Sequence, residues 1–127
     1  MDMTIRSIER QGLMLDTLLP SLPTLLVLRA LEEGPAHGYR ISRWIEQQSE
    51  GVLALKEGTL YPVLHQLEKK GLLLGRWHSP GTERPTKVYE LTDAGRTLLS
   101  RERQTWKHRA AAVERMLSTG EAGHGLA

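Results

Sequence analysis

Proline and glycine residues divide the middle of this chain into short segments, and this division sets the strongest limit on its fold. Pro23 suits the first turn of a helix, where its missing N–H costs no hydrogen bond, and Gly34 and Pro35 end that helix. A helix is therefore predicted over residues 23–33. Its side chains are apolar on almost every side, which is typical of a helix enclosed by the rest of a core.

Two more short helices, each with a single apolar face, are predicted over residues 38–48 and 59–70. In the second of them Pro62 should lie within the first turn, and Gly71 follows at the position where a left-handed residue ends a helix. The apolar run at residues 52–55, between these helices, is long enough for a short strand.

Two β-favouring runs come next, at residues 72–77 and 86–91, and a polar turn-forming cluster separates them. They predict a hairpin with a long polar tip. Thr92 can then cap a last helix over residues 93–117, with Asp93 in its first turn. The expected fold class is mainly α with a small β-hairpin. Three short helices followed by a two-stranded wing is the order of a winged helix-turn-helix domain, here extended by a long C-terminal helix.

The chain has 127 residues, enough for one compact core. We expect a winged helix-turn-helix DNA-binding domain over residues 21–92 and a C-terminal dimerisation helix over residues 93–117. Residues 1–20 are expected to form an N-terminal helical extension, interrupted at Gly12. The Gly-rich residues 118–127 are expected to be a disordered tail.

The positive charge of the chain is concentrated in its second half. The net charge is only +2, but residues 1–55 carry five basic and seven acidic side chains, whereas residues 56–115 carry twelve and seven. A cationic region of this kind is typical of a protein that binds a polyanion.

Several classes of function are excluded by what the sequence lacks. Zero cysteines exclude disulfides and thiolate metal sites, and the five histidines lie far apart, so we expect no metal site and no cofactor. There is no Gly-rich phosphate loop, serine elbow or paired-carboxylate motif, so we expect no enzymatic activity. No apolar run approaches the roughly 20 residues of a membrane helix, and acidic residues occupy the N-terminal stretch. We therefore expect a cytoplasmic protein without a membrane partner.

In a winged helix-turn-helix the third helix enters the DNA major groove, the second crosses the backbone and the wing reaches phosphates. Helical geometry places one set of residues opposite the apolar stripe of the third helix. The candidate DNA-binding residues on it are Thr59, Tyr61, Pro62, His65, Gln66 and Lys69. Tyr39 and Arg43 on the second helix and Arg84 and Lys87 on the wing complete the predicted set. The alternative is that these side chains are simply solvated, or, for Tyr61, packed against the wing.

Apolar residues recur every seven positions along the last helix, at Leu99, Trp106 and Val113. Met116 falls on the intervening seam, but so do Glu102 and Arg109, which a strict coiled coil would not place there. The pattern therefore predicts a helix that packs on its own core and on a partner subunit.

Three segments resemble the signature stretches of PadR-type transcriptional regulators. They are residues 34–39 (GPAHGY), 58–68 (GTLYPVLHQLE) and 87–95 (KVYELTDAG), and the resemblance covers about residues 22–117. It departs at Ser21, Leu22 and Pro23, where many members have Gly-Thr-Leu. The resemblance implies a homodimeric repressor whose last helix exchanges contacts across the dimer. It also implies a cavity between subunits where Trp106 would meet a flat aromatic or drug-like effector, although Trp106 can equally be an interface anchor with no ligand.

The resulting hypothesis is a homodimeric repressor that binds double-stranded DNA at a pseudo-palindromic operator. A small-molecule effector or a stress signal would release it by repositioning the two wings, since a small tilt at the dimer helices would prevent both recognition helices from docking together. The main alternative is a winged helix that joins proteins and does not bind DNA. A regulator of the MarR type is a third hypothesis, against which the three segments argue.

Overall fold

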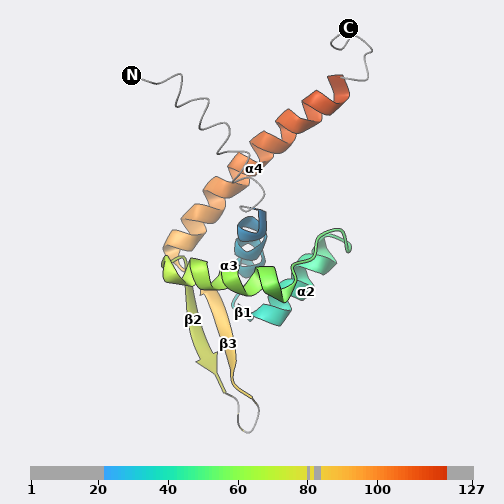
Figure 1. Cartoon of the computed structure of the whole chain (residues 1–127). Coiled ribbons are helices and arrows are strands. Elements are labelled where there is room, and N and C mark those ends of the chain that lie inside the picture. The colour runs from blue at the N-terminus through green and yellow to red at the C-terminus, as the bar shows by residue number, and fades with distance from the viewer. Residues whose placement is uncertain (1–21, 80, 82–83, 120–127) are drawn as a thin grey trace.

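The computed structural model describes residues 22–79, 81 and 84–119 (Figure 1). A helix covers residues 22–32 at its start. The elements that follow are β1 (Ala36–His37), α2 (Gly38–Gln48), α3 (Glu57–Lys69), β2 (Leu73–His78), β3 (Thr86–Leu91) and α4 (Asp93–Thr119). The mainly helical winged helix-turn-helix with a long C-terminal helix is therefore confirmed.

One error in the helix predictions concerns the start of α3. This helix begins at Glu57, two residues earlier than predicted, so Pro62 lies in its second turn and not in its first. The early start places the carboxylate of Glu57 in the first turn, where it interacts favourably with the helix dipole. At the other end the prediction for Gly71 is confirmed, because its φ of 79° is left-handed and its N–H donates to the carbonyl of Glu68 at 3.0 Å.

The strands form one antiparallel sheet in the order β1-β3-β2. The predicted hairpin is β2 and β3, but β1, which has two residues and pairs with β3, was not predicted. The strand predicted at residues 52–55 is absent from this described stretch. There the hydroxyl group of Ser42 donates to the carbonyl of Leu55, and that of Ser49 donates to the carbonyl of Leu53. These side chains provide the hydrogen bonds that a neighbouring strand would otherwise provide to the two carbonyls.

The core lies where the helices meet the base of the hairpin. Its members are Val27, Leu28, Ala30, Leu31, Ile41, Ile45, Leu60, Leu64, Leu67, Leu73, Tyr89, Leu91 and Leu99. Val27 and Leu28 have no exposed surface, which agrees with a central position for the helix over residues 22–32. That helix still carries a charged side, formed by Arg29, Glu32 and Glu33.

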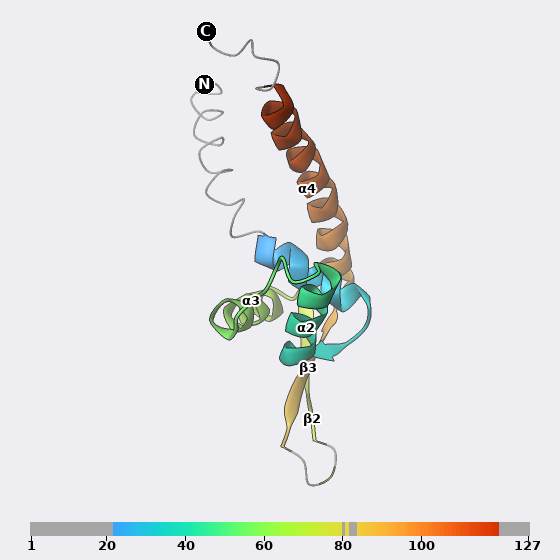
Figure 2. The ribbon, with the colours of Figure 1, turned by 90° about the vertical axis from the view of Figure 1, so that its right-hand side faces the viewer.

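Helix α4 and the hairpin leave this core in opposite directions (Figures 1 and 2). Thr92 forms the joint between them. Its hydroxyl donates to the carbonyl of Gly71 at 2.8 Å and accepts from the N–H of Gly95 at 3.1 Å. The predicted cap is confirmed, and the same hydroxyl ties the start of α4 to the end of α3.

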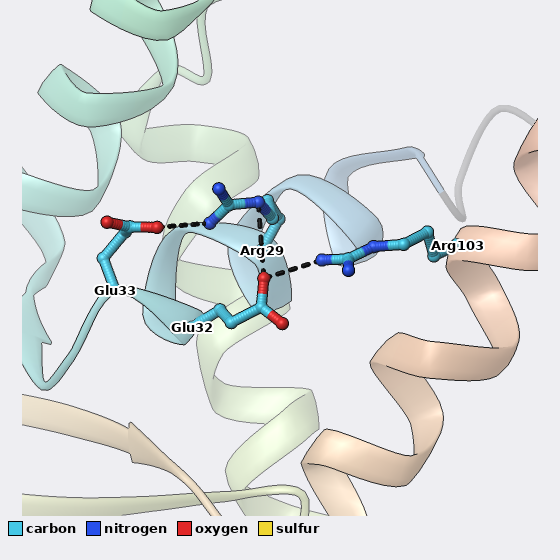
Figure 3. Close-up of polar contacts among 4 residues, drawn as sticks. All are labelled: Arg29, Glu32, Glu33 and Arg103. Atoms are coloured by element: carbon cyan, nitrogen blue, oxygen red, sulfur yellow. Dashed lines mark hydrogen bonds and ion pairs between the residues drawn. The ribbon is translucent and has the colours of Figure 1, made fainter.

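A cluster of ion pairs joins α4 to the helix over residues 22–32 (Figure 3). Arg103 of α4 contacts Glu32 at 2.6 Å, and Arg29 contacts both Glu32 at 3.4 Å and Glu33 at 2.7 Å. These side chains are partly exposed, so each pair is worth about 0.2–1 kcal/mol. Of these pairs, that of Arg103 with Glu32 crosses from the first half of α4 to the core, whereas the Arg29 pairs are local to residues 29–33.

Two predictions concern the ends of the chain. The N-terminal helical extension at residues 1–20 lies outside the described residues. In the predicted tail, Ser118 and Thr119 belong to α4, and the remaining residues also lie outside. Among the helices that the structure describes, none has the length and apolar character needed to cross a membrane.

Candidate nucleic-acid interface

Helix α3 presents a polar face to solvent. Leu60, Leu64 and Leu67 are buried and fix the rotation of the helix about its axis. The face away from the core therefore exposes five of the six predicted residues of this helix, which are Thr59, Pro62, His65, Gln66 and Lys69.

Tyr61 is the exception, and its predicted outward orientation is wrong. The ring is half-buried and packs against the core. It lies so close to Gly38 of α2 that a Cβ atom there would be 2.7 Å from the tyrosine hydroxyl oxygen. Tyr61 therefore joins α3 to the start of α2, and Gly38 is required for that close approach.

The hairpin face that turns toward α3 changes character along its length. Strand pairing places Leu73 opposite Leu91 at the base, Gly75 opposite Tyr89 in the middle, and Trp77 opposite Lys87 farther out. The residues of the first two pairs are buried or half-buried, whereas Trp77 in the third pair is 71% exposed. The hairpin thus extends its inward face beyond the core, and the outer part of that face is free to contact a partner.

Lys87 lies between α3 and the hairpin, and not on the outer surface of the wing. Its ammonium nitrogen contacts Oε1 of Glu68 at 2.8 Å, and the two side chains are 25% and 30% exposed. The hydrogen bond to Glu68 is the main reason that the pKa of Lys87 is raised. The same ammonium lies 5.8 Å from the ring centre of Trp77 and 5.5 Å from that of Tyr89.

A hollow of about 490 Å³ opens between α3, the start of α2 and the hairpin. All three tyrosines of the chain line it, together with Trp77 and His65. Tyr89 forms its floor and is 2% exposed, and burial is the main reason that the pKa of its hydroxyl is raised. The hollow is therefore aromatic in its walls and carries the Lys87 ammonium at its edge.

Helix α2 adds exposed cations beside this hollow. Tyr39 is 68% exposed, and Arg43 is exposed and 3.6 Å from Glu46. His37 is the N-cap, and its Nδ1 accepts from the N–H of Arg40 at 3.3 Å. Arg40 is exposed one turn before Arg43, and sequence reasoning missed it although the helical spacing could have identified it.

The wing contributes two more arginines. Arg84 is exposed near the hairpin tip, as predicted, and Arg76 is exposed on β2, 3.5 Å from Glu90. Arg76 and Trp77 were missed by sequence reasoning. Strand alternation places Trp77 on the same face as Leu73, but it cannot show where the core stops covering that face.

Two of the four residues predicted for an effector or dimer interface are exposed on α4. Val113 and Met116 are 50% and 77% exposed, and Trp106 is half-buried. The prediction for Leu99 is wrong, because it is 3% exposed and belongs to the core of its own chain. It therefore has almost no surface left for a partner subunit.

Alkaline pH is expected to weaken the fold through Lys87 and Tyr89. Both groups bind their protons more tightly in the folded protein than in the unfolded chain, because both pKa values are raised from ordinary values of 10.5 and 10.0. The stability that they contribute is complete below pH 10 and is lost as the pH rises through the raised values. Urea unfolding should report a falling free energy of unfolding in that range. The free energy of unfolding of Glu68→Gln should fall less steeply with pH. An equal fall in the variant and the original protein would contradict the role of the ion pair.

Comparison with known proteins agrees with this geometry. The model of the PadR-like transcriptional regulator family matches residues 27–101. An uncharacterized 37.1 kDa protein in transposon TN4556 of Streptomyces fradiae is 46% identical over 78 residues, which cover 61% of this chain and 21% of that protein. The chain thus spans about a fifth of the length of that relative.

Two solved structures are similar in both fold and sequence. A PadR family transcriptional regulator from Eggerthella lenta has a TM-score of 0.67 and 30% identity, covering 92% of this chain and 98% of that one. PadR of Bacillus subtilis, solved in complex with operator DNA, has a TM-score of 0.55 and 29% identity, covering 60% and 43%.

Proposed function

Because this chain belongs to the PadR-like family of transcriptional regulators, we propose that it binds double-stranded DNA with α3 in the major groove and the wing along the backbone. The observation that carries this proposal is the polar, uncovered face of α3, together with the exposed cations of α2 and of the wing. In this proposal His65 and Gln66 contact base edges, and Lys69, Arg43 and Arg84 contact phosphates. The solved complex of the Bacillus subtilis relative with operator DNA supports this assignment.

The regulator is proposed to act as a homodimer on a pseudo-palindromic operator, and to repress the genes that it controls. Val113, Met116 and Leu117 leave apolar surface exposed on the second half of α4, which supports pairing with a second copy. Two α3 helices would then have to lie about 34 Å apart to occupy successive major grooves. A change in the tilt of α4 would alter that spacing.

Release from DNA is proposed to follow from such a change. The ion pair of Arg103 with Glu32 connects α4 to the helix over residues 22–32, so a signal that moves α4 would be transmitted to the core on which α3 packs (Figure 3). A flat aromatic effector beside Trp106, or a stress signal, would provide the free energy for this movement. The family membership and the half-buried position of Trp106 support this part of the proposal.

The test is a gel shift with the promoter DNA upstream of the gene itself, across a salt series and against a nonspecific competitor. We expect retarded bands that survive the competitor and weaken steeply as salt rises, because phosphate contacts release counterions. Binding that vanishes with competitor, together with a protein partner captured by the exposed face of α3, would instead support a protein-binding winged helix.

A further inference from the structure

The contact between Glu68 and Lys87 has a role that the proposed DNA contacts do not explain. Glu68 projects from the recognition helix α3 toward the hairpin, in line with Tyr61 seven residues earlier. Lys87 comes from β3 of the wing, where a free ammonium would be suited to bind a phosphate. Instead it donates to Glu68 at 2.8 Å in a region where both side chains are largely covered. The wing lysine is thus already neutralised by the helix that it stands beside.

Gly75 shows that the fold leaves space for this ion pair. A Cβ atom at position 75 would lie 2.6 Å from Cε of Lys87 and 2.8 Å from Oε2 of Glu68. Residue 75 faces α3 between Leu73 and Trp77, so any side chain there would displace one or both charged groups. The pair is therefore enclosed by three elements, α3, β2 and β3.

We propose that Glu68 is a positioning residue, which fixes the angle of the wing to the recognition helix through Lys87 and keeps that ammonium from neutralising a DNA phosphate. This inference rests on the proposed DNA-binding function. The physical reason is that a charge-assisted hydrogen bond in a partly covered site requires a narrow range of distances and angles. The ammonium group of an exposed lysine has no such requirement. Glu68 also needs Lys87, since an unpaired carboxylate on α3 would repel the phosphates that α3 approaches.

The consequence for DNA binding is measurable as counterion release. Each phosphate that a lysine neutralises adds about 0.9 to the slope of log affinity against log salt. Releasing Lys87 should therefore steepen the slope by about one unit and tighten binding to DNA of any sequence about five- to tenfold near 0.1 M salt. Discrimination between an operator and other DNA should fall, because the added contact is not sequence-specific.

The experiment measures the binding of the full chain to a random-sequence duplex across a salt series. Glu68→Gln removes the charge, and Gly75→Ala displaces the pair without changing any charge. Glu68→Gln should steepen the slope by about one unit, whereas Gly75→Ala should steepen it by less, because the separated Glu68 carboxylate still repels phosphates. Glu33→Gln is the matched control, because it makes the same change in net charge at an ion pair that involves neither α3 nor the hairpin, and it should keep the original slope. The double variant Glu68→Gln with Lys87→Gln should also keep it, because it has neither a released ammonium nor an unpaired carboxylate.

Two slope results would overturn the inference. One is a slope in Glu68→Gln equal to that of Glu33→Gln, and the other is a shallower slope in the double variant Glu68→Gln with Lys87→Gln than in the original protein, which would mean that Lys87 already binds a phosphate. Amide hydrogen exchange without DNA tests the positioning role separately, and β2 and β3 should exchange faster in Glu68→Gln than in Glu33→Gln. Equal exchange would also overturn it. Failure of the original protein to bind any duplex in a salt-dependent manner would refute the proposed function, whereas the hydrogen exchange result would still decide the positioning role.

Discussion

Replacement of Gly95 by alanine is expected to destabilise the protein by about 1–3 kcal/mol, although alanine is the better helix former. Gly95 lies in the first turn of α4, where a Cβ atom would be only 2.1 Å from the carbonyl oxygen of Leu72. That oxygen belongs to the backbone and accepts a hydrogen bond from the N–H of Thr92, so it cannot turn aside as a side chain would. The start of α4 must move instead, and its contacts with the core weaken.

The matched control is Gly58→Ala. Gly58 lies in the first turn of α3, and a Cβ atom there would have no atom within 4 Å. This change should stabilise the protein by up to about 1 kcal/mol through helix propensity alone. Urea unfolding midpoints measure both effects. If Gly95→Ala unfolded at the same urea concentration as the original protein, or at a higher one, the close contact between α4 and Leu72 would be refuted.

Charge reversal at Lys69 is expected to weaken DNA binding about tenfold or more and to reduce the salt slope by about one unit. Lys69 ends α3 on its exposed face and has no ion-pair partner within the described residues, so its ammonium is available to a phosphate. The loss should be similar for every DNA sequence, because a phosphate contact carries no base information. Binding isotherms of Lys69→Glu with promoter DNA and with a random duplex measure it.

Lys107→Glu makes the same change in charge on an exposed position of α4, which leaves the core on the side opposite to the wing (Figure 1). It should therefore retain most of the affinity and the original slope. Equal losses in the two variants would mean that net charge alone, and not the face of α3, governs binding.

The elements and their ends were largely predictable because their signals are local. The bounds of α2 and of β3 agree with the sequence patterns that predicted them. The left-handed Gly71 and the cap at Thr92 depend on residues within four positions along the chain. Five of the six predicted residues of α3 are exposed, because helical geometry alone determines which side lies opposite a buried stripe.

The sequence-based predictions were wrong for three residues, which are Tyr61, Lys87 and Leu99. All three errors concern tertiary contacts with residues that are distant in the sequence. Helical periodicity could not show that Gly38 would receive the ring of Tyr61. The composition of the hairpin could not show that Glu68 would bind Lys87, which follows it by nineteen positions. The heptad of α4 suggested a partner subunit for Leu99, but the core of its own chain reaches that far along the helix.

By itself the sequence determined the order of the elements, their caps and the apolar stripe of each, since these depend on backbone preferences and on the period of a helix or strand. Only the tertiary structure decided which elements pack beside each apolar stripe and which charged side chains form ion pairs. Those outcomes depend on contacts between residues distant in sequence, where the absence of one Cβ atom at Gly75 leaves space for an ion pair that no local pattern indicates.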